Sequence, residues 1–331
     1  MDKLQRNFIE YALIMKMTKI SICQQDELES EVLKKEFDED FPNNIYFIIS
    51  RPKVTLVPSK CEFKDHVAKF VFKIHEKETV SEESLIIKSA DNTNDFELKS
   101  DYPYTKFYIH ENGKEVFSAK SSLFYFMNQK KYSEKMDSEI LYIGQSYGKN
   151  GKRKPPERLK SHSTLQKIYY EALQNNPDKE IWLNLLSFER LLFTSFDGAD
   201  KSVKREENEV EKATNIMYKF NQNELNEKQI VNFTEASLIK YFKPKYNVVY
   251  KDVFPDPNHK TYTECYDLDV NSVAFELNTE TIGTKLFTEN IKPSYMHLGS
   301  FTLESREKRK SLFGILDNDL PFNNYANIKI E

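Results

Sequence analysis

The chain has 331 residues with a formal net charge of −4, and 39% of its residues are hydrophobic, including 24 Phe and 19 Tyr. This length and composition predict two or three packed domains, and no apolar run reaches the ~18 residues that a membrane helix needs. The negative charge argues against general coating of nucleic acid, so any such contact requires local basic patches. Three cysteines far apart in the chain give no metal-binding spacing and are typical of a reducing compartment, which predicts a cytoplasmic location and no membrane partner.

Residues 1–105 are predicted to form a β-rich N-terminal domain with leading helices. A helix, a short strand at Ile20–Cys23 and a second helix are expected within residues 1–40. Between Lys69 and His75, apolar residues alternate with mostly polar ones, which is the period of a half-buried strand.

Residues 106–250 are predicted to form a second domain, which begins with strands. Asn112-Gly113 separates two strand-like runs and is a strong hairpin signal. The run Ser122–Asn128 is expected to be a further strand. Ile140–Ile143 is expected to be another, because β-branched and aromatic residues suit a pleated surface.

A glycine-rich, basic loop follows the strand that contains Tyr142. Three of the eight glycines of the chain, Gly144, Gly148 and Gly151, lie here, and glycine allows tight turns and close approach to a ligand. From Lys149 to Lys167 there are seven basic residues and one acid, a local charge of 7 − 1 = +6. Such a loop suits contact with phosphates, although a solvated basic loop is an equally good explanation. The side chains predicted to contact nucleic acid are Lys149, Lys152, Arg153, Lys154 and Lys160.

The rest of this domain is predicted to be helix, strand and helix. An amphipathic helix over about 156–173 places Arg158 and His162 one turn apart on one face. A third strand at Glu180–Phe188 is followed by a charged insertion at about 190–232. A helix then follows that contains Phe233 and Glu235 and that Pro244 ends. Residues 251–331 are expected to form a small β-rich C-terminal segment.

Several of these residues together resemble the motifs of the GIY-YIG nuclease family, over roughly residues 123–250. The resemblance implies an α+β fold, with a small central antiparallel sheet flanked by helices between the two β-rich parts. The first motif of the family lacks its glycine here, and Tyr125 is the best match to its tyrosine, with Tyr108 and Tyr132 as alternatives. The matching residues are Tyr142-Ile143-Gly144, Arg158 and His162, Glu235, Pro244 and Asn247.

The resemblance implies metal-dependent hydrolysis of a phosphodiester, which requires an activated water and stabilisation of charge on the phosphoryl oxygens. Tyr142 would act as general base or position the water, and Tyr125 would assist it by hydrogen bonding. Glu235 would hold one divalent cation, Mg²⁺ or Mn²⁺.

Three further side chains complete the implied site. Arg158 would face the scissile phosphate, and His162 would accept or relay the proton. Asn247 would orient groups around the metal. Taken singly, Arg158 and His162 also suit a solvated helix face, and Asn247 suits a turn.

Structural explanations also exist for the other candidates. Tyr142 on a strand suits a hydrophobic core, and Glu235 with Asn232 resembles a capping box at the start of a helix. The functional interpretation is preferred because the residues occur together, in the family's order, on the expected elements.

The sequence therefore predicts a metal-dependent endonuclease that acts on DNA, with restriction or anti-phage defence as the context by analogy. Cleavage of RNA by the same site, and an inactive nucleic-acid-binding module that keeps the nuclease fold, are the alternatives. Cutting both strands of a duplex needs two sites or two events, so a homodimer is expected.

Overall fold

The computed structural model describes residues 8–36, 44–77, 79–90, 93–129, 134–146, 159, 163–196, 203, 205, 207–221, 227–248, 251 and 270–303. The chain divides into two compact units. Unit 1 comprises Met1–Ile49, Glu139–Ser163 and Trp182–Glu331, and unit 2 comprises Ser50–Ser138 and Thr164–Ile181. The domain boundaries predicted at residues 105 and 250 stay predictions, since a compact unit is not the same as a sequence domain.

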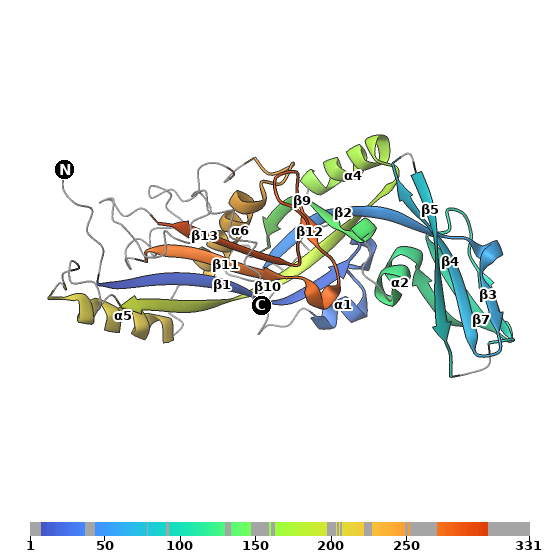
Figure 1. The fold of residues 1–331 in the computed structure, drawn as a ribbon, viewed down its shortest axis with the longest axis horizontal. Helices are drawn as coiled ribbons and strands as arrows, with labels where there is room; N and C mark the ends of the chain where they lie inside the picture. The colour runs from blue at the N-terminus through green and yellow to red at the C-terminus, as the bar shows by residue number, and fades with distance from the viewer. Residues whose placement is uncertain are drawn as a thin grey trace, which may run out of the picture. The chain divides into compact units, whose positions relative to one another are not determined.

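Unit 1 is built on a mixed sheet (Figure 1). Its strands hydrogen-bond in the order β12-β9-β2-β10-β1-β11-β13. The central strand β1 pairs antiparallel with β10 and parallel with β11, and β11 pairs antiparallel with β13. The bounds are β1 Ile9–Cys23, β2 Ile45–Leu56, β9 Ser138–Gln145, β10 Lys179–Phe196, β11 Ser272–Asn278, β12 Leu286–Phe287 and β13 Met296–Thr302.

The longest helix of unit 1, α6 (Glu227–Phe242), packs against β11 and β13. Its Tyr241 ring lies edge-on to Phe275 of β11, with 5.3 Å between the ring centroids. The helix ends at Lys243, whose φ of 49° is left-handed, and at Pro244, which cannot continue the helix. The other helices described in unit 1 are α1 (Glu31–Glu36), α5 (Glu209–Asn221) and 3₁₀ turns at Gln25–Glu27 and Glu280–Ile282.

Unit 2 contains two groups of strands. The last part of β2 pairs antiparallel with β4, which also pairs with β3 and β5. A separate three-stranded sheet has the order β6-β7-β8. The bounds are β3 Glu62–Lys64, β4 Val67–Glu76, β5 Thr79–Lys88, β6 Phe96–Lys99, β7 Lys106–Glu111, β8 Lys114–Lys120, α2 Ser121–Asn128 and α4 Ser163–Asn175, with 3₁₀ turns at Pro58–Lys60 and Glu134–Met136.

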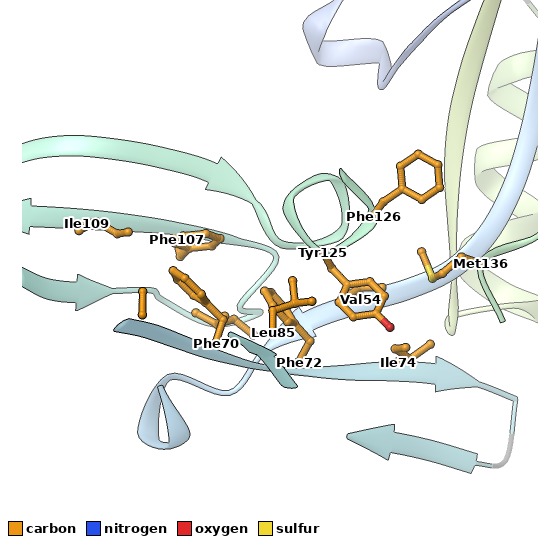
Figure 2. Close-up of a cluster of buried hydrophobic side chains, with 12 residues drawn as sticks. Val54, Phe70, Phe72, Ile74, Leu85, Phe107, Ile109, Tyr125, Phe126 and Met136 are labelled. Carbon is orange, nitrogen blue, oxygen red and sulfur yellow. The ribbon is translucent and has the colours of Figure 1, made fainter. Parts of the chain in front are cut away.

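An aromatic cluster fills the interior of unit 2 (Figure 2). Phe72 of β4 is fully buried, as is Phe107 of β7. Phe70 connects them, with its ring centroid 5.5 Å from that of Phe107 and 6.4 Å from that of Phe72. The alternation predicted between Lys69 and His75 is therefore confirmed. Phe70, Phe72 and Ile74 of β4 are buried in the cluster, whereas the side chains of Lys69, Lys73 and His75 are only partly buried.

The Asn112-Gly113 hairpin is confirmed. The two residues join β7 to β8, with Glu111 opposite Lys114. Both have a left-handed backbone, with φ of 51° at Asn112 and 78° at Gly113. Asparagine and glycine tolerate this conformation at the lowest cost, and its twist matches the twist of the flanking strands.

The predicted fold class, an α+β fold with a small central antiparallel sheet flanked by helices, is wrong. The protein is strand-rich, and the described strands β1–β5 and β9–β13 join one mixed sheet of ten strands. The main error is β1, whose beginning was expected to be helical. Ile9–Leu13 of β1 is buried at every position, Glu10 included, and does not alternate. A strand that is buried on both faces lacks the period of two, so periodicity does not distinguish it from a buried helix.

Two further elements differ from the prediction. Ser122–Asn128 was expected to be a strand, but it forms most of α2. The third strand, expected at Glu180–Phe188, is confirmed but continues to Phe196 into the expected insertion. None of the helices in the described ranges is long and apolar enough to cross a membrane.

Candidate active site

Two tyrosines from neighbouring strands lie against each other in unit 1. The backbone N–H of Ser146 donates to the carbonyl of Asn44 at 2.9 Å, so the end of β9 lies beside the start of β2. There the rings of Tyr46 and Tyr142 stack, with centroids 6.3 Å apart and an interplanar angle of 30°. Tyr46 is fully buried and Tyr142 is half-buried.

Gly144 allows the two rings to come this close. A Cβ at this position would lie 2.5 Å from the Tyr46 hydroxyl and 2.8 Å from Cε1 of Tyr142. Any side chain here would therefore displace one of the rings. The glycine predicted to permit close approach is needed for the contact between the two tyrosines.

A cluster of one acid and two amides lies at the end of the same strand. The side-chain NH₂ of Gln145 donates to Oε2 of Glu235 at 2.6 Å and to Oδ1 of Asn232 at 2.7 Å. Asn232 and Glu235 are three apart on α6 and therefore share one face of the helix. Asn232 is buried and Glu235 is half-buried.

Asn247 fastens the turn after α6 to the strand of Tyr142. Its Oδ1 accepts the backbone N–H of Ile143 at 2.9 Å, and its NH₂ donates to the carbonyl of Ile143 at 2.8 Å. Next to it, the backbone N–H of Tyr246 donates to the carbonyl of Leu141 at 3.0 Å. Asn247 thus reproduces with its side chain the pair of bonds that a neighbouring strand would make.

The oxygens of Glu235 and Asn232 suit a single divalent cation. Both converge on one hydrogen-bond donor, the amide nitrogen of Gln145, and rotation of that amide would turn its own oxygen towards the same point. Mg²⁺ prefers oxygen ligands and is often held by one or two carboxylates, with water and substrate phosphates completing the shell. The described residues contain no group of three or more His, Cys, Asp or Glu suited to a metal.

Tyr125, predicted to assist Tyr142, belongs to unit 2 and lies in its aromatic cluster. Figure 2 shows its ring among Val54, Phe72 and Ile74, and the Phe72 and Tyr125 centroids are 5.5 Å apart. Burial, and then the charge of Glu83, raises the pKa of Tyr125 to about 12. The tyrosine that accompanies Tyr142 is Tyr46.

The capping-box explanation of Glu235 does not hold. The helix begins at Glu227, so Asn232 and Glu235 lie well inside it. Their side chains contact Gln145 and not only the helix backbone.

The basic part of the predicted site lies outside the described residues. These calls stay predictions: Arg158 and His162 as catalytic residues, and Lys149, Lys152, Arg153, Lys154 and Lys160 as contacts to nucleic acid.

Three residues of the candidate site were not found from the sequence: Tyr46, Gln145 and Asn232. Tyr46 is the second residue of an apolar run, Ile45–Ser50. No local pattern of the sequence marks it as the neighbour of Tyr142. Comparison of the chain with protein-family models, curated proteins and solved structures finds no match. The function is therefore inferred from the side chains themselves.

Proposed function

We propose that the chain is a metal-dependent endonuclease that hydrolyses phosphodiester bonds in DNA. The observation that supports this is the convergence of Glu235 and Asn232 on the end of strand β9, whose Tyr142 stacks on Tyr46. Tyr142 and Gln145 are three residues apart on β9, about 10 Å at ~3.3 Å per residue, and their side chains leave the strand on opposite faces. The proposal therefore requires the substrate to reach both side chains around the end of the strand at Gln145.

The residues of the chain divide the chemistry between them. Glu235 and Asn232, with the amide oxygen of Gln145, would hold the divalent cation, whose positive charge stabilises the phosphoryl oxygens. Tyr142 would orient the attacking water and accept its proton. Tyr46 would fix the ring of Tyr142, and Asn247 would hold the strand on which that ring is mounted.

Arg158, His162 and the basic residues that follow Gly144 supply the remaining part of the proposal by resemblance. Arg158 would face the scissile phosphate, and His162 would relay the proton. The lysines would contact neighbouring phosphates, which gives affinity without sequence specificity.

The test is cleavage of supercoiled plasmid by the purified full chain with Mg²⁺ or Mn²⁺, with EDTA as control. Glu235→Gln keeps the shape and an acceptor for Gln145 but removes the charge. We expect cleavage to fall by more than ~100-fold, because even outer-shell changes at metal sites cost 10–100-fold. The matched control is Glu227→Gln, in the exposed first turn of the same helix, which should cut like the parent.

The outcomes separate the alternatives. Cleavage that survives Glu235→Gln would place the activity elsewhere and end the proposal. DNA binding without cleavage, at every metal tested, would favour the inactive nucleic-acid-binding module. Preferential cleavage of RNA in a parallel assay would change the substrate but not the site.

The biological context and the assembly are also proposals. Restriction or anti-phage defence in the cytoplasm follows by analogy with the resembling family. Cutting a duplex with one site per chain favours a homodimer on DNA. A monomer that makes double-strand breaks in one encounter, seen by light scattering and nicking kinetics, would contradict the dimer.

A further inference from the structure

Unit 2 has an open cleft of about 560 Å³ between the β2–β4 pair and the loop that precedes β7. Its floor comes from a short antiparallel register in which Lys53 lies opposite His75 and Thr55 lies opposite Lys73. Tyr102 and Tyr104 form the other wall. A cleft of this volume is in the range of small-ligand sites.

The charged side chains that line this cleft are all basic. Among the described residues that line it, Lys53, Lys73 and His75 can carry positive charge and none is an acid. Burial lowers the pKa of His75, and the charges of Lys53 and Lys73 lower it further, against an opposing effect of Asp178. The ammonium groups of Lys53 and Lys73 therefore both act on His75, and a bound anion would offset their positive charge.

Two acids of the same unit, Asp178 and Glu82, bond to other groups. The carboxylate of Asp178 accepts the backbone N–H of Lys77 at 2.8 Å. Glu82, which lies opposite Lys73 on β5, bonds to Nζ of Lys60 at 2.6 Å. Asp178 keeps its charge in this bond and opposes the effect of the two lysines on His75, but neither acid lines the cleft.

The tyrosine wall is held in place by backbone bonds. The carbonyl of Tyr104 accepts the N–H of Leu56 at 2.9 Å and the hydroxyl of Ser121 at 2.8 Å. Tyr102 lies edge-on to Tyr104, with centroids 6.1 Å apart and planes at 84°. Because Tyr102 is itself 86% exposed, its ring is presented to solvent on an anchored loop.

We propose that this cleft binds a nucleotide unit of a single nucleic-acid strand, with its phosphate at Lys53 and Lys73 and its base stacked on Tyr102. Lysines beside an exposed aromatic ring are the combination by which proteins bind single strands without reading sequence. The hydroxyls of Thr55 and Ser100 line the same cleft, where Thr55 already bonds to Nε2 of His75 at 2.9 Å and Ser100 donates to the carbonyl of Lys106 at 2.7 Å. The inference does not depend on cleavage by unit 1.

Binding is measured on the full chain in EDTA, by fluorescence anisotropy of a labelled 12-nucleotide single strand. Tyr102→Ala should weaken binding roughly 5- to 100-fold, because stacking on one aromatic ring is worth about that much. The matched control is Tyr170→Ala, at an exposed tyrosine of α4 in the same unit, which should bind like the parent.

The lysines are tested by salt dependence. Lys53→Gln with Lys73→Gln should reduce the slope of log affinity against log salt by about 0.7, because both lysines contact one phosphate and each phosphate contact on a single strand contributes ~0.7. Lys99→Gln with Lys114→Gln removes two exposed lysines of the same unit and should leave the slope unchanged. If both double variants reduce the salt slope equally, the strand is attracted to the positive charge of the whole unit and not to this cleft. That result would overturn the proposal.

Photo-crosslinking locates the contact directly. A strand carrying 5-iodouracil should attach to the peptide that contains Tyr102 or Tyr104. Attachment elsewhere, together with unchanged binding by Tyr102→Ala, would overturn the proposal. Displacement of the strand by a free 5′-mononucleotide at micromolar concentration would identify a free nucleotide as the ligand, whereas displacement only by longer strands supports the strand.

Discussion

Tyr46 and Tyr142 touch although most of unit 2 separates them in the chain. Both rings lie so close to Gly144 that a Cβ there would overlap them. This packing restricts the ring of Tyr142, which suits a group that must orient water. A hydroxyl held by packing loses little entropy when it meets its substrate.

Removing each hydroxyl tests the pair. Tyr142→Phe should lower plasmid cleavage by about 10²-fold or more, the contribution expected of a general base. Tyr46→Phe should lower it less, since the ring contact remains. Tyr125→Phe should cut like the parent, because that ring lies in the aromatic cluster of unit 2. Equal losses in all three variants would return Tyr125 to the site.

Asn247 acts on the same strand through the backbone. Asn247→Ala leaves the N–H and the carbonyl of Ile143 without their buried partner, which should lower the free energy of unfolding by about 1–3 kcal/mol. Asn175→Ala, at the exposed end of α4, should change it by less than ~0.5 kcal/mol. Urea unfolding measures both, and an unchanged midpoint for Asn247→Ala would show that the two bonds are replaced by water.

At the scale of elements, β1 holds the sheet of unit 1 together because strands lie on both of its sides. Leu13 faces Leu192 of β10 across one edge and Val273 of β11 across the other. Leu13→Ala should cost about 2–5 kcal/mol of stability through the cavity that it leaves. Leu191→Ala on β10, where the side chain is 46% exposed, should cost less than ~0.5 kcal/mol. Thermal and urea unfolding of the two variants check the difference.

The contact between α6 and β13 contains a titratable group. His297 accepts from the Tyr241 hydroxyl at 3.4 Å and donates to the carbonyl of Ser294 at 3.0 Å. Burial lowers the pKa of His297 from 6.5 to about 4. The unfolded chain therefore binds a proton between these values, whereas the folded chain does not.

Stability should consequently fall as the pH falls from about 6.5 to about 4, by up to ~3 kcal/mol from this group. Above pH 6.5, where His297 is neutral in both states, its effect no longer lowers the free energy of unfolding. His297→Gln should flatten that part of the profile, and His66→Gln, at an exposed histidine of unit 2, should leave it as it is. Urea unfolding at pH 7 and pH 4.5 gives the comparison, and equal slopes for parent and His297→Gln would contradict it.

Local patterns predicted local structure. The strand of Tyr142, the helix of Glu235 and the Asn112-Gly113 hairpin follow from side-chain period and turn chemistry within a few residues. Tyr46 was missed because its contact with Tyr142 depends on which strands become neighbours, and Ser50–Ser138 lies between them in the chain. The beginning of β1 was misjudged for the same reason, since burial on both faces removes the alternation that marks a strand.

At the scale of the molecule, unit 2 is made of two internal segments of the chain, and unit 1 of three segments that reach from the start of the chain to its last part. Each unit therefore depends on contacts between distant residues. Contacts of this kind slow folding, because loop-closure entropy is lost before the contacts form.

The position of β1 has a consequence for synthesis of the protein. β1 is translated before both of its partner strands, which lie at Lys179–Phe196 and Ser272–Asn278. At ~5–20 residues per second the ribosome needs on the order of ten seconds to reach the first of them. During that interval both edges of β1 lack their partner strands, and unit 2 is complete only at about the same point of synthesis, when Ile181 has been made. We expect β1 to be the first segment of the nascent chain that a chaperone must protect from aggregation.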